Sequence, residues 1–330
     1  MRVIVAGDDN CFRPHMVVWL IRAFQRLGCE VIHVASHYRN DGSSSYVDPV
    51  YVEPNHRFSS SPTTLSEVLS QVGHVDLCVM VFQCVNYWTI KNDRNDVPFA
   101  YIWREGNDWE KNFVFDCLGD GFCFVCMVGK GVEWPQKSEF MSFAADRLFL
   151  ERGPSFENRE YDLIYTGRER GTGCYERLRN MLIPLNMTHF LQGHIDGYES
   201  YGGMLRRSKA TYAVDSGRYI MSRGLEAMAS GCVVFWDEGN NPYGGDGFRR
   251  LNFIQSQDYL PTQVEEFGGD FFPSGDFISR LYTICRNRDE WTRISENSRN
   301  AILNGHTYEH RASRIAEIFG IQLPKKVEEC

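Results

Sequence analysis

Apolar residues in the first part of the chain fall into short runs that alternate with amphipathic segments. Residues 2–6 form an apolar run that ends in the polar tetrapeptide 7–10. The next segment carries Pro14 in its first turn, apolar residues at helical spacing and Gly28 at its end, which predicts a helix. Residues 30–35 form a second apolar run, so the pattern predicts a strand–helix–strand unit with parallel strands.

The same alternation continues through the first half of the chain. Residues 40–62 are rich in Ser, Asn, Asp and Pro, which predicts a long surface loop. Helical spacing returns at 63–72, and apolar runs predict strands at 75–82, 97–103 and 121–128. Strands that alternate with helices in this way indicate a doubly wound α/β domain.

The pattern begins again after residues 152–155, which include Gly-Pro. It predicts strands at 161–167, 188–193, 209–214 and 232–236, and helices at 174–184 and 222–230. From about residue 271 onward the spacing is helical, with helices predicted at 277–286, 289–303 and 310–319. The sequence therefore predicts two α/β domains with a cleft between them, residues 1–153 and 154–308, and a C-terminal helix and tail at 309–330.

Composition narrows the class of protein. The hydrophobic fraction is 43% and the net charge is -8, which is ordinary for a globular protein and argues weakly against wrapping nucleic acid through phosphate contacts. The 11 cysteines show no disulfide framework, and Cys123 and Cys126 fall in a strand that would point them to opposite faces. No apolar run reaches the length of a membrane helix, and no signal peptide precedes the first strand, so we expect a cytoplasmic protein without a membrane span.

Two loops of the second half have the placement of a ligand site. In parallel sheets, ligands bind at the carboxyl ends of the strands, where helix N-termini offer free N–H groups to a phosphate. Thr166, Gly167 and Arg168 follow the first strand of this half, where Gly167 allows close approach and Arg168 offers a fork of donors. Alternatively, this loop is a turn with a solvated arginine.

The second loop leads into the helix predicted at 222–230. Ser222 is a candidate N-cap, and Arg223 lies in the first turn, where its charge opposes the helix dipole and suggests a phosphate partner. Glu226 lies three residues further on, so that both side chains can project from one face, and its carboxylate can accept two hydrogen bonds from ribose hydroxyls. An amphipathic helix with an Arg–Glu surface pair is the alternative.

Two polar loops of the first half are candidates for acceptor binding and catalysis. One follows the first strand and contains Asp8, Asp9, Asn10 and His15. The other ends a later strand and contains Trp103, Arg104, Glu105 and Asp108. Asp8, Glu105 or Asp108 could act as the general base on an acceptor hydroxyl, and Asp9, Asn10, His15, Trp103 and Arg104 could contact the acceptor. Charged loops without a catalytic role remain the alternative.

The run from Arg223 to Val234 resembles the donor-site signature of GT-B glycosyltransferases, specifically those similar to the CgeB-like spore-maturation proteins with a glycosyltransferase family-4-like C-terminal domain. Its Arg-Gly-Leu-Glu-Ala-Met-Ala-Ser-Gly matches their Arg-x-hydrophobic-Glu-Ala-x-Ala-x-Gly pattern. Further elements agree in order, namely residues 161–167, 193–194, 208–210 and 306–312. In the helix after 161–167 the match is loose, because Arg177 is followed four residues on by Met181 where the family would have leucine.

The resemblance implies two Rossmann-like domains facing each other across a cleft, with the last helix crossing back to the first domain. It also implies a nucleotide-diphosphate sugar donor, no metal and no other cofactor. Glu226 would bind the ribose, while Arg223, Thr166, Gly167 and Arg168 would lie near the diphosphate. Related retaining enzymes carry a second Glu eight positions before the ribose-binding one; here that position is Arg218, so retention and inversion both stay open.

Other functions remain open at this stage. A nucleotide-sugar epimerase or a non-catalytic sugar-nucleotide binding protein would use the same scaffold. A receiver-like signalling domain is disfavoured, because Asp76 begins its strand rather than ending it. The acceptor is expected to be a carbohydrate or another biomolecule, with a phage-type transfer to a hydroxylated DNA base as the alternative, which would place the protein in a host cytoplasm. The sugar, the nucleotide and the oligomeric state are not determined by the sequence.

Overall fold

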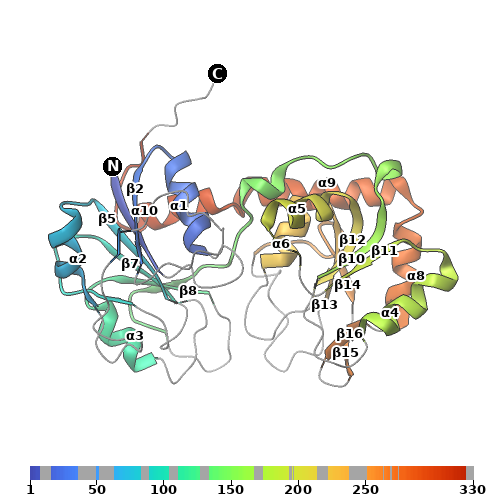
Figure 1. The fold of residues 1–330 in the computed structure, drawn as a ribbon, viewed down its shortest axis with the longest axis horizontal. Helices are drawn as coiled ribbons and strands as arrows, with labels where there is room; N and C mark the ends of the chain where they lie inside the picture. Colours follow the sequence, from blue (N-terminus) through green and yellow to red (C-terminus); the bar gives the residue numbers. More distant parts are fainter. Residues whose placement is uncertain are drawn as a thin grey trace. The chain divides into compact units, whose positions relative to one another are not determined.

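The computed structural model describes residues 1–7, 16–35, 50–51, 63–82, 89–103, 111–126, 134–166, 174–192, 195, 197–213, 222–237, 251–262, 264–267, 270–273 and 275–324. The chain divides into two compact units (Figure 1). The first comprises Met1–Ser142 together with Tyr308–Cys330, and the second comprises Phe143–Thr307.

The first unit contains a parallel sheet and the last helix of the chain. Its strands are β1 (Arg2–Ala6), β2 (Glu30–Ala35), β3 (Val50–Tyr51), β4 (Thr63–Thr64), β5 (Leu77–Phe82), β6 (Ile90–Lys91), β7 (Phe99–Trp103), β8 (Phe122–Val125) and β9 (Ser138–Phe140). Its helices are α1 (Met16–Arg26), α2 (Leu65–Val72), α3 (Lys111–Leu118) and α10 (Tyr308–Ile318).

Seven strands of the first unit form one sheet in the order β3-β2-β1-β5-β7-β8-β9, and every pair in it is parallel. The short strands β4 and β6 pair separately. Strands such as β5 are buried along their whole length, which explains why they read as continuous apolar runs rather than as alternating ones. The chain builds outward from β1 in both directions, so the sheet reverses between β1 and β5, as in Rossmann-like domains.

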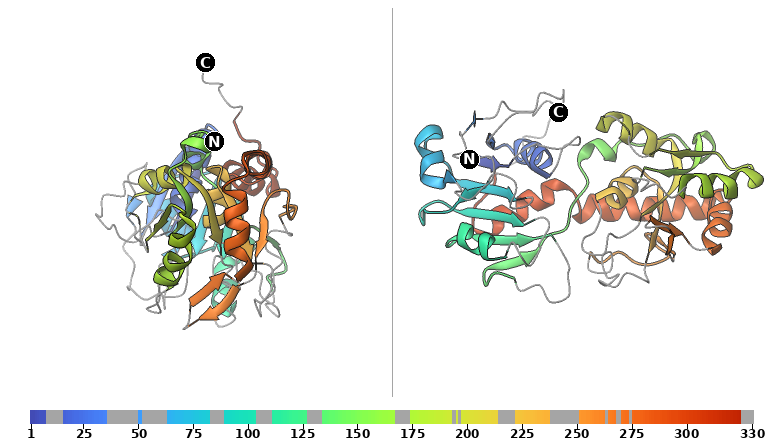
Figure 2. Two further views of the ribbon diagram at one scale, coloured as in Figure 1. Left: turned by 90° about the vertical axis from the view of Figure 1, so that its right-hand side faces the viewer. Right: turned by 60° about the horizontal axis from the view of Figure 1, so that its bottom comes forward.

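Helices cover both faces of this sheet (Figure 2). Ile4 and Ala6 of β1 face a core that includes residues of α2 and α3, whereas α1 and α10 pack together beside β1 and β2. The start of α2 has a capping box, because the Thr64 hydroxyl accepts from the Glu67 amide and the Glu67 carboxylate accepts from the Thr64 amide.

The last helix belongs to the first unit, which confirms the expectation that it returns to the first domain. The Tyr308 ring lies 6.5 Å from the Trp19 ring of α1, and Arg26 of α1 pairs with Glu309 at 3.0 Å. Arg311 donates to the carbonyl oxygen and the hydroxyl of Ser142, at 3.0 and 2.8 Å. Burial lowers the pKa of Arg311 to about 10.

The second unit is a smaller parallel sheet with its own helices. Its strands are β10 (Tyr161–Tyr165), β11 (His189–Leu191), β12 (Ser208–Ala213), β13 (Val233–Asp237), β14 (Leu260–Thr262), β15 (Val264–Phe267) and β16 (Asp270–Pro273). Its helices are α4 (Cys174–Leu182), α5 (Tyr198–Arg206), α6 (Ser222–Ala229), α8 (Gly275–Ile284) and α9 (Arg288–Gly305), with short 3-10 turns η2 (Arg147–Leu150), η3 (Phe156–Asn158) and η4 (Ile183–Leu185).

Five of these strands form a parallel sheet in the order β11-β10-β12-β13-β14. Leu163, Tyr212 and Phe235 of the sheet share a core with residues of α4 and α8 on one face. The helix α6 packs against β12, β13 and α9. No helix in the described part of the chain is long and apolar enough to cross a membrane.

One expectation for this unit was wrong in part. The chain was expected to be helical from about residue 271 onward, but β16 occupies Asp270–Pro273 and forms an antiparallel hairpin with β15. Two strands this short present too few positions for a period of two to be distinguished from a helical period. The helix α5 was not predicted either, because Gly202 and Gly203 in its middle oppose helix formation.

The half-buried Arg311 is expected to stabilise the first unit. Replacing it with Ala leaves the two Ser142 oxygens without this donor, which should lower the free energy of unfolding by roughly 1–3 kcal/mol. Arg314 on the same helix is the matched control, because its pairs with Glu139 and Glu317 are largely exposed and should contribute at most about 1 kcal/mol. Urea unfolding of both variants checks this, and equal losses would contradict it.

Candidate functional site

The order of strands in the second sheet marks one position for a ligand. From β10 the chain goes first to β11 on one side and then to β12 on the other, so the direction of winding reverses between β10 and β12. In open parallel sheets, ligands bind at the carboxyl ends of the strands at such a switch point. Thr166 directly follows β10, and Ser222 begins the helix that follows β12, so both predicted donor-site segments belong to the two strands that flank this point.

The direction of α6 follows from contacts at its far end. Arg159 donates to the carbonyl oxygen of Ser208, the first residue of β12, at 2.5 Å, and to that of Ser230, just after α6, at 3.4 Å. The carboxyl end of α6 therefore lies beside the amino end of β12. Since α6 runs antiparallel to the strand that precedes it, its N-terminus lies at the carboxyl edge of the sheet, where its free N–H groups favour an anion.

The helix ends in a tightly fixed turn. Cys232 donates its N–H to the Ala227 carbonyl at 2.9 Å and Gly231 donates to the Met228 carbonyl at 3.0 Å, which together form a Schellman motif. Gly231 has a φ of 77°, the left-handed conformation that this motif requires. The Ser295 hydroxyl of α9 donates to the Gly231 carbonyl at 2.9 Å. Gly231 therefore gives a sharp exit from α6 into β13.

Glu226 is only 5% exposed, which is unusual for a carboxylate and places it inside the unit rather than on a solvated helix face. Arg223, one turn earlier in α6, is half-buried. An ordinary surface pair of Arg223 and Glu226 is therefore not what the structure shows. Ser222 is the first residue of α6 rather than the residue before it, so the cap position falls on residue 221, outside the described residues.

Thr166 is buried, while Gly167 and Arg168 lie outside the described residues. On the other face of the sheet, Tyr165 stacks on Tyr212 with ring centroids 4.1 Å apart, and Tyr175 of α4 contacts Tyr165 edge-on at 5.8 Å. These aromatic contacts fix the carboxyl ends of β10 and β12 relative to each other. These tyrosines give no functional signal in the sequence, because isolated aromatic residues in strands are typical of any core.

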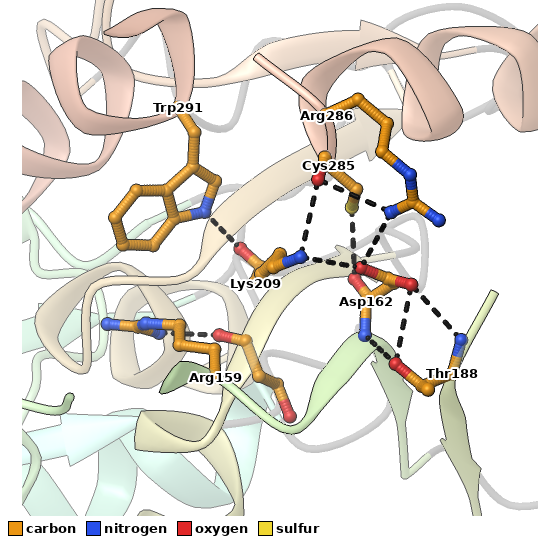
Figure 3. A network of polar contacts seen from close by, with 8 residues as sticks. Arg159, Asp162, Thr188, Lys209, Cys285, Arg286 and Trp291 are labelled. Atoms are coloured by element: carbon orange, nitrogen blue, oxygen red, sulfur yellow. Dashed lines mark hydrogen bonds and ion pairs between the residues drawn. The ribbon is translucent and has the colours of Figure 1, made fainter. Parts of the chain in front are cut away.

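A polar network holds the opposite, amino edge of the sheet (Figure 3). One Asp162 oxygen accepts from Lys209 at 2.9 Å and from Arg286 at 3.3 Å, and the other accepts from the backbone and hydroxyl of Thr188. The Trp291 indole donates to the Lys209 carbonyl at 2.8 Å. The network joins the beginnings of β10 and β12 to α8 and α9, so it fixes the scaffold and lies away from the switch point.

Most candidate residues of the first half lie outside the described residues, namely Asp8, Asp9, Asn10, His15, Arg104, Glu105 and Asp108. Gly7, the last described residue before Asp8, directly follows β1 at the switch point of the first sheet. A Cβ on Gly7 would lie 2.9 Å from the Val81 carbonyl oxygen, so this position needs glycine. Trp103 is fully buried in the core, and its acceptor-binding role stays a prediction.

Seven cysteines are buried free thiols, namely Cys29, Cys78, Cys117, Cys123, Cys126, Cys232 and Cys285. Burial raises the pKa of Cys123 well above its usual range and that of Cys117 to about 12, so neither is a reactive thiolate near neutral pH. Within the described ranges, no group of three or more His, Cys, Asp or Glu residues could hold a metal ion.

Part of the chain is similar in sequence to a known protein family. Residues 185–317 match the sequence model of a family described as glycosyl transferase-like. This segment contains α6 with Arg223 and Glu226. No curated protein sequence matches the chain.

Solved structures match nearly the whole chain. A glycosyltransferase from Rickettsia africae is 10% identical with a TM-score of 0.57, and the match covers 96% of this chain and 97% of that one. The Anabaena protein HepE, solved with UDP and glucose, is 9% identical with a TM-score of 0.58 and coverages of 97% and 99%. An α-glucosyltransferase solved with UDP is 9% identical with a TM-score of 0.57 and coverages of 96% and 100%. The chain therefore has the GT-B fold, and its residues 185–317 are similar in sequence to a glycosyl transferase-like family.

Proposed function

We propose that the protein transfers a sugar from a nucleoside diphosphate sugar to an acceptor hydroxyl without a metal ion. The observation that carries the proposal is the placement of Glu226, a buried carboxylate on a helix whose N-terminus lies at the switch point of the second sheet. The glycosyl transferase-like match includes this helix, and two GT-B structures similar to this chain were solved with UDP. UDP-sugars are therefore the first donors to test.

In this proposal the Glu226 carboxylate accepts hydrogen bonds from the two ribose hydroxyls. Arg223, the loop of Thr166, Gly167 and Arg168, and the N–H groups that begin α6 lie around the diphosphate. The bond between the anomeric carbon and the diphosphate oxygen breaks, and the leaving nucleoside diphosphate takes the electron pair. Its developing charge is stabilised by arginine and the helix N-terminus, which supply the positive charge that a metal would otherwise provide.

The acceptor oxygen forms the new bond to the anomeric carbon and gives its proton to a carboxylate. Asp8, Glu105 and Asp108 are the candidates for this base, and Asp9, Asn10, His15, Trp103 and Arg104 for acceptor contacts. We favour a carbohydrate or another biomolecule as acceptor. The finer likeness to CgeB-like proteins rests on the spacing from Arg223 to Gly231 and on the C-terminal motif at 306–312, and it stays a prediction.

Replacing Glu226 with Gln should weaken UDP binding at least tenfold. A hydrogen bond to a charged group contributes about 1.5–3 kcal/mol, and each 1.4 kcal/mol corresponds to about a factor of ten. Glu199→Gln, on the exposed surface of α5 in the same unit, is the control and should bind UDP like the parent protein. Calorimetric titration measures both. If the Glu226→Gln variant binds UDP as tightly as the parent protein, Glu226 does not bind the ribose.

Removing metal ions with a chelator should leave the rate of donor turnover unchanged. Turnover of the preferred donor, found from a panel of UDP-, GDP-, ADP- and dTDP-sugars, is expected to continue at the same rate in excess EDTA, because arginine and the helix N-terminus balance the leaving charge. Chromatography of the released nucleoside diphosphate follows the rate. Loss of activity in EDTA and its recovery on adding Mg²⁺ would show that a metal is needed.

The same panel separates the proposed transfer from its rivals. Without an acceptor, a transferase should release nucleoside diphosphate and free sugar slowly through attack by water. An isomerised nucleotide sugar would instead identify an epimerase, and binding with no turnover, with or without a mixture of sugar acceptors, would identify a binding protein. Mass spectrometry and NMR of the products distinguish these outcomes.

A further inference from the structure

Arg159 is a buried arginine that lies between the first residue of β12 and the turn after α6. It precedes β10 by two positions and is 8% exposed. Its guanidinium carbon lies 4.6 Å from the centre of the Trp291 ring of α9. The side chain therefore touches three elements of the second unit, and α6, the helix that carries Glu226, ends against it.

The Arg159 guanidinium donates hydrogen bonds to backbone oxygens rather than to a carboxylate. Its two terminal nitrogens donate to the carbonyl oxygens of Ser208 and Ser230, and it also interacts with the buried Cys232 thiol and, more weakly, with Glu296. No carboxylate lies at ion-pair distance from it in the part of the chain that the structure describes. Burial lowers its pKa. Since Ser230 follows the last turn of α6, the positive guanidinium stands at the negative end of the helix dipole.

This arrangement is not the one that stability alone favours. The Arg159 Nε and the Ser230 hydroxyl are buried and have no hydrogen-bond partner among the described residues. A buried charge without a counter-ion and an unused donor both cost free energy, and an apolar side chain of similar length would avoid both costs. The planar guanidinium of Arg159 holds two carbonyl groups at fixed positions, which an apolar side chain could not do.

Ser230, whose carbonyl oxygen accepts from Arg159, is hydrogen-bonded through its own N–H to Glu226. Ser230 donates its N–H to the Glu226 carbonyl at 3.0 Å, so the residue fixed by Arg159 is one helical turn from the buried carboxylate. The Arg159 guanidinium also packs closely against Gly231, because a Cβ on Gly231 would lie 2.9 Å from an Arg159 nitrogen. The helix has eight residues, about 12 Å in length, so a shift at its carboxyl end moves the whole helix.

We infer that Arg159 is a positioning residue of the donor site, which sets the place of Glu226 at the ribose by holding α6 in register with β12. This inference rests on the proposed function, and it adds a residue at the amino edge of the sheet, remote from the ligand. It predicts that Arg159 controls nucleotide affinity beyond its effect on stability.

The test compares Arg159→Met and Arg159→Lys with a control at the same edge of the sheet. Lys209→Met is that control, because its ammonium group contacts buried Asp162, the Cys285 carbonyl and the Phe156 ring, which all lie outside α6. The Arg159→Met variant is expected to bind UDP about tenfold more weakly, since small misplacements of a binding group are costly. Arg159→Lys, which keeps the charge but not the fork, should recover part of the affinity.

Thermal unfolding is measured on the same samples, and titrations are made well below each melting temperature. The Lys209→Met protein should lose at least as much thermal stability as Arg159→Met and still bind UDP within about twofold of the parent protein. The inference is overturned if Arg159→Met binds UDP like the parent protein. It is also overturned if Lys209→Met loses as much affinity for the same loss of stability.

Amide hydrogen exchange separates this inference from the proposed function. In Arg159→Met, peptides from 222–230 should exchange faster than in the parent protein, while peptides from 275–284 should not change. If the parent protein binds no nucleotide at all, the proposed function fails, and the exchange of α6 still decides whether Arg159 holds the helix. Unchanged exchange at 222–230 would show that it does not.

Discussion

The second sheet can present a ligand to the N-terminus of α6 only if the other end of that helix is held in register with the strands. Three attachments provide this: the Schellman turn at Gly231, the Ser295 hydroxyl on the Gly231 carbonyl, and the Arg159 guanidinium on the Ser230 carbonyl. All three act on the backbone. The helix is thereby fixed at the amino edge of the sheet, while its N-terminus faces the switch point, where we propose that the diphosphate binds.

The two edges of this sheet therefore carry different sets of polar residues. The amino edge contains the charged network of Asp162, Lys209 and Arg286, in which a buried carboxylate is satisfied by two cations and a threonine. The carboxyl edge contains Thr166, Ser222 and Arg223, with Glu226 one turn inward. In the proposed donor site, the anion and the two hydroxyl groups of the nucleotide would lie at the carboxyl edge, away from the network of Asp162.

Much of the fold was predictable from the sequence, because its strands are buried on both faces and read as uninterrupted apolar runs. The strands 2–6 and 30–35 agree with β1 and β2, and the predicted helix 222–230 agrees with α6 within one residue. The elements that were missed are short or contain residues that oppose their structure, as do the two glycines of α5. Pattern alone cannot detect elements that tertiary packing stabilises against local preference.

The sequence predicts a candidate site residue only where a chemically suitable residue type stands at a recognisable position of a helix or strand. Glu226 and Gly231 stand out because they fall on the Glu and the final Gly of the pattern Arg-x-hydrophobic-Glu-Ala-x-Ala-x-Gly. Arg159 gives no such signal, since it lies in the charged run 157–160 that is typical of an exposed loop. Its burial against Trp291 depends on a helix more than a hundred residues away, which no local pattern records.

The most direct test of the central claim is an experimental structure of this protein with UDP bound. The account predicts that the ribose hydroxyls lie within about 2.6–3.2 Å of the Glu226 carboxylate oxygens, with the diphosphate at the N-terminus of α6. A nucleotide bound elsewhere, with Glu226 out of reach of the ribose, would contradict it.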